Sequence, residues 1–530
     1  MRIGIDFDNT IAQYDKIFVK AAINEGFISK GWFGNKAALK KKLNKKQIQW
    51  QTLQGQVYGP LMPKAICFSG VQKFLCKANL IKYEIFIISH KTIYGHYDKT
   101  NTKLRDQALL WLERKNFFKK KYIGLKKENI FFCDSIEAKI NKINELNLDF
   151  MIDDLNKIFE ASILKKTKTI LFNSQYNKTK AVYRCQTWDE ISNVIFTKKQ
   201  NESSLIQICN LMHPGFKFNS INKINQGKNS NVYTLRNKKN NFLILKEYPN
   251  DNLGVKHRLK KELKALKILD NSNYVPKVIH HNYSMDIIML EYIEGKSIRK
   301  ISNKNIEDAL IFVKKLYKLS QNIKFNLATE ACLSANELIR QIDCRFDDLK
   351  IIADEDLQDL ISKLSELYKN LKVKSLETWP KKNIDNKLEK KYLVLNPSDF
   401  GFHNSILDNN NILKFIDFEY FGFDDPVKLV SDFLWHPGMK LSKLQKKKFA
   451  LNSFKLFKDD ENFYKRFCSA LPLYGIRWSL IILNDFLKNR NNISKTEEKK
   501  VKELLKLQLK KSKNIYNTLL YNDINYIYGK

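Results

Sequence analysis

The sequence lacks paired cysteines: its eight cysteines are scattered over 530 residues, and no two of them form a Cys-x-x-Cys pair. This spacing supports neither a disulfide framework nor a cysteine zinc site, and we expect a reducing, cytoplasmic compartment. No stretch approaches the roughly 18 uninterrupted apolar residues of a membrane span, so we expect no membrane partner. The first ten residues carry acids where a signal peptide would need an apolar run, so we do not expect export.

Acidic residues are also scarce, because 56 Asp and Glu stand against 93 Lys and Arg, a formal net charge of +37. Such an excess is typical of proteins with a polyanionic partner. The excess is nearly all lysine, however, and it runs the whole length of the chain beside many asparagines. A general compositional bias explains it better than a nucleic-acid patch, so nucleic acid is not an expected partner. The positive field still attracts anionic substrates such as nucleotides and sugar phosphates.

Hydrophobic residues make up 43% of the chain, enough to bury two or more domain cores. Residues 1–196 alternate short apolar runs with helical segments, which predicts βα units and a parallel sheet. These runs lie at 2–7, 84–89, 130–133, 150–152 and 169–172. A helical, Lys-rich stretch at about 14–63 interrupts the alternation like an inserted cap. The polar segment 197–204 is predicted to be a linker.

A second α/β pattern begins near residue 205. Short β-like runs and one helix extend to about 296, and the pattern is then mostly helical to about 516. Residues 205–530 are therefore predicted to form a two-lobed α+β domain, with a small sheet lobe (about 205–296) before a larger helical lobe (about 297–516).

The first motif with chemistry is Asp6-Phe7-Asp8-Asn9-Thr10, at the end of the apolar run 2–7. Ligands of open α/β sheets bind at the carboxyl ends of the strands. Two neighbouring carboxylates suit Mg²⁺, and one of them can attack phosphorus while the other moves a proton. Asp-x-Asp alone is a weak signal, since any acidic loop after a strand also contains it.

Further residues of the same chemistry follow in order. Ser89 ends the run 85–88, Lys139 lies in a helical segment, and Asp153 and Asp154 end another apolar run. In this order the N-terminal part resembles the haloacid dehalogenase (HAD-like) superfamily over about 195 residues. The resemblance implies a Mg²⁺-dependent phosphohydrolase, acting on a phosphorylated metabolite, in which the cap sets substrate choice.

The same resemblance assigns roles to individual residues. Asp6 is the nucleophile, Asp8 is the general acid/base, and Lys139 balances the charge, with Lys142 as the fallback. The remaining assignments are phosphate binding by Thr10 and Ser89 and Mg²⁺ binding by Asp6, Asp8, Asp153 and Asp154.

The second set of candidate residues resembles a kinase nucleotide site. Gly227 and Ser230 lie in a loop whose backbone N–H groups could approach phosphate, although a simple hairpin turn has the same composition. Lys246 stands inside an apolar strand, where a buried ammonium needs an acid partner, and Glu262 in the following helix is a suitable one. Such a pair holds the α- and β-phosphates in protein kinases.

The strongest signal is Asp399 followed by Asn404, with Asp417 at the end of the next β-like run. A polar turn alone would not predict all three at this spacing together with the Lys246–Glu262 pair. Residues 219–432 resemble the aminoglycoside phosphotransferase and choline kinase-like families, with looser similarity to about 516.

This second resemblance implies ATP and Mg²⁺ as cofactors and a small-molecule hydroxyl as the acceptor. The implied roles are the catalytic base for Asp399, Mg²⁺ ligation for Asn404 and Asp417, phosphate positioning for Lys246 and Glu262, a phosphate loop for Gly227 and Ser230, and an adenine hinge around Glu291 and Ile293.

For some neighbouring residues the sequence leaves the role undecided or predicts no part in the reaction. Pro397 replaces the histidine that usually braces this loop, which affects loop geometry more than the reaction. Glu419 either stays near the metal or is a surface or N-cap acid, and the second is favoured; His403 and His436 are expected to be ordinary loop histidines. The acceptor is expected between residues 336–379 and 435–478. Its candidate contacts suit a polyol or a cation, and equally a surface or a core: Asp343, Asp347, Asp348, Trp435, Tyr474 and Trp478.

The leading hypothesis is a bifunctional cytoplasmic enzyme, in which an ATP-dependent phosphotransferase acting on a sugar, amino alcohol or aminoglycoside-like hydroxyl is fused to a HAD-type phosphatase. In one alternative only the kinase half is catalytic, and the HAD-like half is a regulatory module that binds a phosphorylated metabolite. A second alternative, a basic nucleic-acid-processing enzyme, rests on the net charge alone. No residue names the acceptor or the phosphatase substrate.

Overall fold

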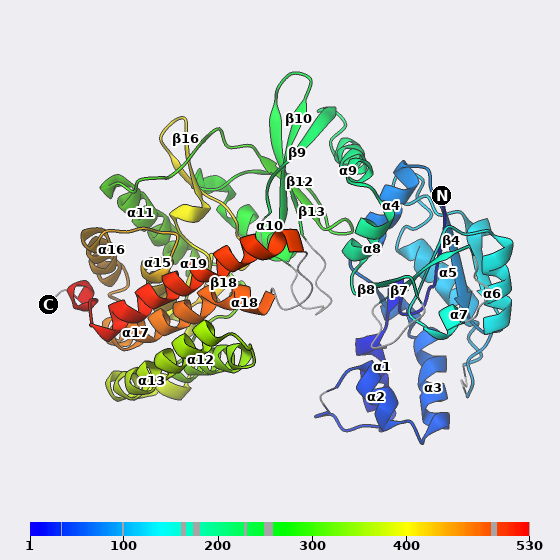
Figure 1. Ribbon diagram of the computed structural model, residues 1–530, viewed down its shortest axis with the longest axis horizontal. Helices are drawn as coiled ribbons and strands as arrows, with labels where there is room; N and C mark the ends of the chain where they lie inside the picture. Colours follow the sequence, from blue (N-terminus) through cyan, green and yellow to red (C-terminus); the bar gives the residue numbers. More distant parts are fainter. Residues whose placement is uncertain are drawn as a thin grey trace. The chain divides into compact units, whose positions relative to one another are not determined.

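A computed structural model describes residues 1–32, 34–97, 100–160, 166–172, 181–226, 230–248, 258–488 and 495–528. The chain forms two compact units, Met1–Lys256 with Ile279–Leu290 and His257–Val278 with Glu291–Lys530. Figure 1 shows both and labels some of their helices and strands.

A six-stranded parallel sheet forms the centre of the α/β part of the first unit, with the strand order β5-β4-β1-β6-β7-β8. Its strands are β1 (Arg2–Ile5), β4 (Glu84–His90), β5 (Ile130–Cys133), β6 (Phe150–Asp153), β7 (Lys168–Phe172) and β8 (Tyr183–Cys185). The central strands are apolar throughout because both faces of the sheet are buried. The predicted parallel sheet is confirmed, and β8 is a strand that the apolar pattern did not indicate.

One set of helices covers this sheet, and three further helices form the inserted segment. The sheet helices are α4 (Val71–Leu80), α5 (Leu104–Arg114), α6 (Ile136–Glu145), α7 (Lys157–Glu160) and α8 (Trp188–Ile195). Between β1 and β4 lie α1 (Asp15–Asn24), α2 (Lys36–Lys42) and α3 (Gln47–Tyr58), with the short strands β2 (Ala12–Gln13) and β3 (Ile66–Cys67) paired at their base. Phe18, Leu39 and Leu53 join these three helices to the main core. The inserted segment is therefore helical, as predicted.

The segment 197–204, predicted to be a linker, is instead the cap and first half of helix α9 (Lys198–Met212). Thr197 and Gln200 form a capping box, so the polar composition marks a helix start rather than an unstructured connection. Leu205, Ile208 and Cys209 on the following turns are buried in one apolar cluster with Cys76 of α4.

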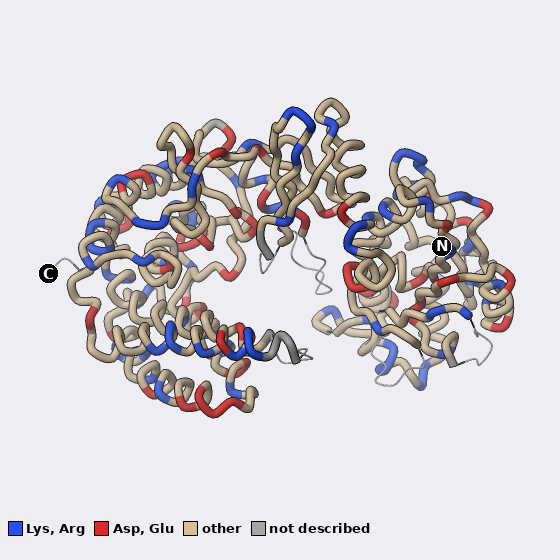
Figure 2. Tube along the Cα trace, turned by 45° about the horizontal axis from the view of Figure 1, so that its top comes forward, with Lys and Arg blue, Asp and Glu red and all other residues tan. Residues whose placement is uncertain are grey.

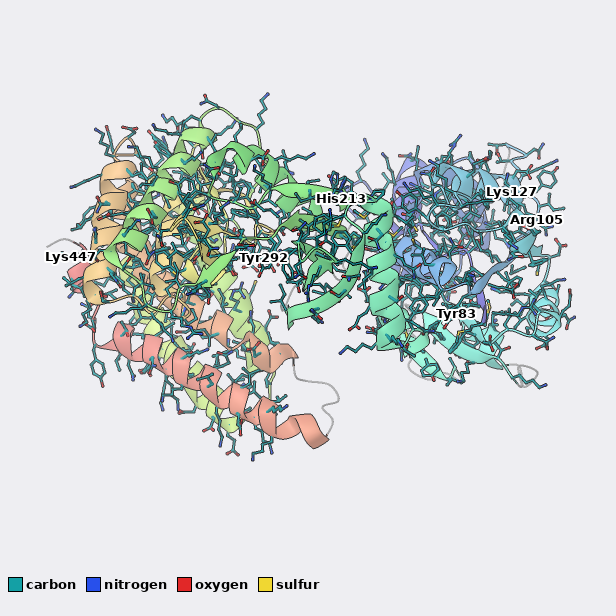
Figure 3. The ribbon with its side chains drawn as sticks, turned by 90° about the horizontal axis from the view of Figure 1, so that it is seen from above. Tyr83, Arg105, Lys127, His213, Tyr292 and Lys447 are labelled. Carbon is teal, nitrogen blue, oxygen red and sulfur yellow. The ribbon has the colours of Figure 1, made fainter. Side chains whose placement is uncertain are left out.

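Polar contacts hold both ends of α9 within the first unit. Gln200 Nε2 donates to the hydroxyl of Tyr83 at 2.8 Å near its start, and His213 Nδ1 lies 3.0 Å from His280 Nε2 just after its end. Tyr83 and His213 are labelled in Figure 3. The compact units therefore separate further along the chain than the predicted linker.

A second sheet follows α9, with the strand order β12-β13-β11-β10-β9. Its strands are β9 (Phe218–Gln226), β10 (Asn231–Asn237), β11 (Phe242–Glu247), β12 (Val278–Asn282) and β13 (Ile287–Glu291). A buried ion pair joins it to the α/β part, because Lys73 Nζ of α4 lies 2.8 Å from Glu247 Oε1 at the end of β11. Burial alone would raise the pKa of Glu247, but Lys73 and Lys77 lower it to about 2.

The second unit is mostly helical. Its main helices are α10 (Arg258–Leu269), α11 (Asn303–Ser320), α12 (Ala335–Lys350), α13 (Glu355–Thr378), α15 (Pro426–Trp435), α16 (Lys443–Leu456), α17 (Phe463–Ile482) and α19 (Lys495–Leu520). The loops that carry the predicted residues Asp399, Asn404 and Asp417 join short strands. One sheet consists of β14 (Gly295–Ser297), β16 (Ser405–Asp408) and β17 (Leu413–Phe415). A second is the pair of β15 (Val394–Asn396) and β18 (Gly422–Asp424). The segment Phe463–Leu487 is long and apolar enough to cross a membrane, but 78% of its most apolar window is buried inside the fold.

Positive charge follows the whole trace. Figure 2 shows Lys and Arg on the α/β part, the second sheet and the helical part alike. This distribution agrees with a compositional bias.

Candidate active sites

Three carboxylates meet at the carboxyl edge of the parallel sheet. Strands β1 and β6 are neighbours in register, and the Asp6 N–H donates to the Ile152 carbonyl at 2.9 Å. This pairing places Asp6 beside Asp153, and one carboxylate oxygen from each of Asp6, Asp153 and Asp154 lies within 4.8 Å of the others. The two predicted acidic strand ends are thus brought together.

Lys139 of α6 is completely buried beside these acids. Its Nζ donates to Asp6 Oδ1 at 2.5 Å and to Asp153 Oδ2 at 2.6 Å. The fallback residue Lys142 pairs with Glu145 instead, at 2.5 Å on the surface. Lys139 is therefore the lysine that faces the acidic cluster.

The electrostatics of this cluster suit a divalent cation. Burial raises the pKa of Asp6 to about 7, against the opposing effect of Lys139, and the Asp153 and Asp8 carboxylates raise it further. Burial also raises the pKa of Asp154, with Asp153 and Asp6 adding to the rise. Several carboxylates crowd around Lys139, and carboxylate oxygens are the ligands that Mg²⁺ prefers.

The other predicted residues of this site line the same edge. Asp8 Oδ1 accepts from the Tyr14 hydroxyl at 2.6 Å, and its Oδ2 lies 2.8 Å from Lys91 Nζ. Thr10 is fully buried, and its hydroxyl has no hydrogen-bond partner among the described residues. Ser89 is buried near the end of β4, which is the neighbour of β1. A buried, unsatisfied hydroxyl at a strand end fits the predicted contact with a phosphoryl oxygen.

Sequence reasoning missed two cations at this site. Lys91 follows Ser89 by two residues, so the period of β4 was the signal that could have identified it. Lys36 comes from α2, where its Nζ donates to Asn9 and lies 4.5 Å from the centre of the Phe18 ring. Burial lowers the pKa of Lys36. No spacing in the sequence links Lys36 to the strand ends, because only folding of the inserted helices brings it there.

The second candidate site is built around Asp399. His403 Nε2 lies 2.9 Å from Asp399 Oδ1, and His436 Nε2 lies 3.5 Å from the same oxygen. The two imidazole rings are stacked, with centroids 3.7 Å apart and planes 7° from parallel. The expectation that both are ordinary loop histidines is therefore wrong. Short-range sequence patterns could not reveal His436, which follows a separate helix.

The contacts around Asp399 and His436 determine which of their atoms carry protons. Burial alone would raise the pKa of Asp399, but the hydrogen bond and charge of His403, together with His436 and Asn404, lower it to about 2. Burial and the neighbouring His403 lower the pKa of His436 to about 4. The Gly438 N–H donates to His436 Nδ1 at 3.1 Å, so a neutral ring carries its proton on Nε2, towards Asp399. Asp399 is thus a fully ionised carboxylate held by donors.

The loop that carries Asp399 is braced without the usual histidine. Asn396 Oδ1 accepts from the Ser398 N–H at 2.9 Å, and Asn404 Nδ2 donates to the Asp399 carbonyl at 3.0 Å. Ser398 and Asp417 have φ angles of +67° and +70°, a left-handed conformation that costs non-glycine residues about 1–3 kcal/mol. These side-chain contacts hold the loop on both sides of Asp399, and the effect of Pro397 stays a prediction.

A second group of carboxylates lies beside this loop. One oxygen from each of Glu262, Asp417 and Glu419 lies within 4.8 Å of the others. Glu419 is 1% exposed, so the favoured interpretation as a surface or N-cap acid is wrong. The Ile416 N–H donates to the Asn404 carbonyl at 3.0 Å, and Asn404 Nδ2 also donates to Asp399 Oδ2. Because its nitrogen is engaged, Asn404 would offer its Oδ1 to a metal ion, which fits the predicted role.

The predicted nucleotide-binding residues fall in both units. Lys246 is buried in β11 and Ser230 is buried just before β10, whereas Gly227 lies outside the described residues. The pairing of Lys246 with Glu262 stays a prediction. At the predicted hinge, Glu291 exchanges two bonds with Lys277, since its N–H donates to the Lys277 carbonyl and its carboxylate accepts from the Lys277 N–H. The backbone roles of Glu291 and Ile293 towards adenine stay predictions.

Several candidate acceptor contacts have internal partners. Asp343 accepts from the Tyr368 hydroxyl at 2.8 Å, Asp347 pairs with Lys350, and Tyr474 is buried. Trp478 Nε1 donates to Asp432 Oδ1 at 2.8 Å, and its ring meets His436 edge-on with centroids 4.7 Å apart. Trp478 therefore packs against His436 of the Asp399 site while Asp432 holds its indole N–H.

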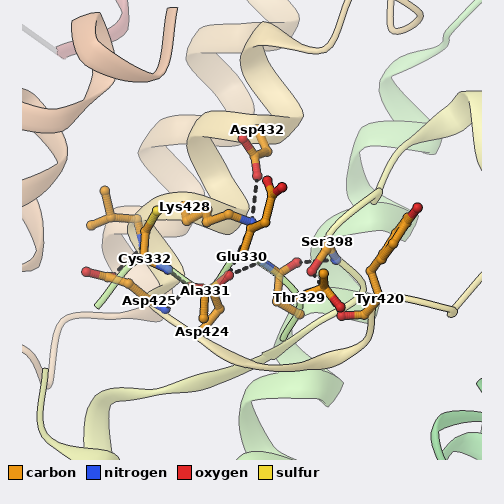
Figure 4. A network of polar contacts seen from close by, with 12 residues as sticks. Thr329, Glu330, Ala331, Cys332, Ser398, Tyr420, Asp424, Asp425, Lys428 and Asp432 are labelled. Carbon is orange, nitrogen blue, oxygen red and sulfur yellow. Dashed lines mark hydrogen bonds and ion pairs between the residues drawn. The ribbon is translucent and has the colours of Figure 1, made fainter. Parts of the chain in front are cut away.

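A buried charge network supports the same region (Figure 4). Lys428 Nζ lies 3.2 Å from Asp424 Oδ2 and 3.0 Å from Asp432 Oδ2. Asp424 also accepts from the Cys332 N–H at 2.9 Å. Burial alone would lower the pKa of Lys428, but Asp424 and Asp432 raise it, so the lysine is charged in the fold. The network connects β18 and α15 to Trp478 and, through it, to His436.

Replacing Lys428 with methionine is expected to lower the free energy of unfolding by about 3–5 kcal/mol, because the buried Asp424 loses its cation and Asp432 keeps only Arg477, at 3.5 Å. Urea denaturation followed by circular dichroism measures the loss. Lys350→Met removes an exposed ion pair with Asp347 and is the matched control, with a much smaller expected effect. Equal stability of the two variants would contradict the importance of the network.

Comparison with known proteins agrees with part of this picture. Residues 220–441, less than half of the chain, match the model of the phosphotransferase enzyme family. A search of curated proteins finds no match. The family match supports a kinase-like phosphotransferase domain in the C-terminal part. It does not reach residues 1–219, so the resemblance of the N-terminal part stays a prediction.

Solved structures that are similar include three kinases of amino alcohols. The ethanolamine kinase of Plasmodium vivax has 16% identity and a TM-score of 0.41, covering 62% of this chain and 92% of that chain. The choline kinase of Cryptosporidium parvum has 13% identity and a TM-score of 0.40, covering 62% and 98%. The choline kinase of Streptococcus pneumoniae has 14% identity and a TM-score of 0.38, covering 57% and 94%.

Proposed function

We propose that the C-terminal part of the chain transfers the γ-phosphoryl group of ATP to a hydroxyl of a small molecule. The observation that supports this most is the carboxylate of Asp399, ionised and held by His403 and Asn404, beside the group of Glu262, Asp417 and Glu419. One part can orient an acceptor hydroxyl, and the other can hold a metal–phosphate group.

In this reaction the acceptor oxygen forms a bond to the γ-phosphorus, the bond to the β–γ bridging oxygen breaks, and ADP leaves. With a pKa of about 2, Asp399 is a weak base. Its main role is therefore to accept a hydrogen bond from the hydroxyl and orient the oxygen, and it takes the proton late, as the new bond forms. Asn404 and Asp417 would hold Mg²⁺, which supplies charge neutralisation for the phosphates.

The test is ATP consumption by the intact protein with a panel of hydroxyl acceptors, including sugars, sugar phosphates, amino alcohols and nucleosides. We expect at least one acceptor to stimulate ADP release well above the acceptor-free rate. Calorimetric titration of MgATP runs in parallel. Failure of the wild-type protein to bind MgATP would exclude the proposal.

We propose a second activity, hydrolysis of a phosphate ester by a HAD-like site in the α/β part. The bridge from Lys139 to both Asp6 and Asp153 supports it. Asp6 would attack phosphorus and form an aspartyl phosphate while the ester oxygen leaves with a proton from Asp8. Water then attacks the aspartyl phosphate while Asp8 takes a proton from it, which releases inorganic phosphate and regenerates both Asp6 and protonated Asp8.

The remaining residues of this site would stabilise charge. Lys139 offsets the negative charge near Asp6, while Thr10 and Ser89 hold phosphoryl oxygens. Asp6, Asp8, Asp153 and Asp154 would hold Mg²⁺, which supplies charge neutralisation to the phosphoryl group. The regulatory alternative, binding of a phosphorylated metabolite without turnover, uses the same residues without the covalent step.

A further inference from the structure

A cavity of about 240 Å³ lies within the second unit, where the segment after α15 meets α16 and α19. Its walls combine apolar, aromatic and cationic side chains. The lining residues are Leu434, Trp435, His436, Pro437, Met439, Lys440, Leu441, Lys446, Lys511, Asn514, Ile515 and Thr518. This volume suits a molecule of the size of a monosaccharide derivative.

The charge of the lining has one sign. Lys440, Lys446 and Lys511 contribute to it, and no Asp or Glu lines the cavity among the described residues. Lys446 Nζ lies 5.5 Å from the centre of the Trp435 ring, and burial lowers the pKa of this lysine. Asp523 opposes that effect, but its carboxylate is 2.7 Å from Lys443 Nζ. Lys446 is thus a partly buried ammonium with little negative charge nearby, and such a group favours binding of an anionic ligand.

The cavity adjoins the Asp399 site through two of its lining residues. His436 lines the cavity, and its Nε2 lies 3.5 Å from Asp399 Oδ1. Met439 also lines the cavity, and its Sδ accepts from the Phe402 N–H at 3.1 Å within the Asp399 loop. Lys511 acts electrostatically on His436 from the far wall. A ligand in the cavity is thus separated from the acceptor-orienting carboxylate by one imidazole ring.

We infer that this cavity binds the anionic end of the phosphoryl acceptor, and that the acceptor is a small polyol bearing a phosphate or carboxylate group. The anion contacts Lys446 and Lys511, which leaves the hydroxyl end of the molecule on the side of the cavity formed by His436, the ring next to Asp399. A cationic acceptor would meet three lysines and, among the residues that the structure describes, no carboxylate in the lining of this cavity, so the lining selects against it. The inference rests on the proposed phosphotransferase function.

Calorimetric titration with four probes tests the charge of the ligand. Glucose 6-phosphate, gluconate, glucose and choline are titrated into the intact protein saturated with MgADP, so that the nucleotide site does not capture the anions. We expect glucose 6-phosphate or gluconate to bind at least tenfold more tightly than glucose and choline, and to weaken as salt is raised. The better of the two anions identifies the phosphate or the carboxylate as the recognised group. Glucose or choline binding as tightly as both anions, or no anion binding at millimolar concentration, would overturn the inference.

Two substitutions locate the bound anion. Lys446→Gln and Lys511→Gln each remove one cation and are expected to raise the Kd of the bound anion about tenfold. Lys448→Gln is the matched control, because Lys448 lies on the same helix but pairs with Glu307 at 2.6 Å outside the cavity. An unchanged Kd in both cavity variants would place the anion elsewhere and overturn the inference.

The same preparations separate this inference from the proposed function. Anion binding that depends on Lys446 and Lys511, with no ATP consumption, would leave the site standing and refute phosphotransfer. ATP consumption with neutral or cationic acceptors alone would leave phosphotransfer standing and refute the anionic acceptor.

Discussion

Replacing Asp399 with alanine is expected to lower kcat for phosphoryl transfer by about a thousandfold while the affinity for MgATP stays nearly unchanged. A positioned base contributes on the order of 10²–10⁴ to rate, and Asp399 faces the acceptor rather than the nucleotide in the proposed reaction. Asp417→Ala is instead expected to act first on the affinity for MgATP. It removes a carboxylate beside Glu262 and Glu419 that would hold the metal–phosphate group, so MgATP binding itself should weaken at least tenfold.

Calorimetric titration of MgATP and steady-state ADP release, measured on the same preparations, separate the two effects. Asp347→Ala is the matched control, because Asp347 is an exposed carboxylate of the same unit whose ion pair with Lys350 lies on the surface. Equal MgATP affinity in wild type, Asp399→Ala and Asp417→Ala would contradict the proposed role of Asp417 in binding the metal–phosphate group. The second unit would then be a kinase-like fold with another use.

The acidic strand ends could be predicted because their chemistry is local. Asp6 directly follows β1 and Asp153 ends β6, and parallel neighbours necessarily bring their carboxyl ends together. Lys139 was predictable from its order in the motif, and its contacts with both acids agree with that. Lys36 could not be predicted, since its approach to Asn9 depends on how the inserted helices fold over the sheet edge.

The surroundings of Asp399 show the same limit. Asn404 follows Asp399 by a fixed offset within one turn, and the short spacing fixes their contact. His436 reaches the same carboxylate from the end of α15, a placement determined by tertiary packing against Trp478 and the charge network of Lys428. Glu419 shows how composition can mislead, because an acid four residues after the end of a strand is ordinarily solvated but here is buried.

The linker prediction failed for a physical reason that applies beyond this chain. A polar run such as 197–204 lacks apolar periodicity, and this absence is typical of linkers. The same composition occurs where Thr197 caps a helix whose apolar residues begin only at Leu205. Capping signals at Thr197 and Gln200 were therefore more informative than the polarity of the run.

Replacing Asp6 with asparagine is expected to abolish Mg²⁺-dependent hydrolysis of an aryl phosphate, by at least a thousandfold. The amide has nearly the same shape as the carboxylate but cannot form the aspartyl phosphate. MgATP binding should be unchanged, because the proposed metal–phosphate group of that site does not include Asp6. Release of p-nitrophenol from p-nitrophenyl phosphate, with and without EDTA, measures the activity and its metal dependence. Asp134→Asn is the matched control, since Asp134 follows β5 at the same sheet edge but is exposed and paired with Arg105.

The outcome for wild type and Asp6→Asn together decides between an enzyme and a binding module in the α/β part. Hydrolysis by wild type that survives in Asp6→Asn would show that Asp6 is not the nucleophile. No hydrolysis by wild type, with binding of inorganic phosphate that weakens when Lys139 is replaced by methionine, would instead support the regulatory alternative. The two results are distinguishable because only turnover requires a carboxylate at position 6, whereas phosphate binding requires cations and hydroxyls: Lys139, Thr10 and Ser89 remain intact in Asp6→Asn.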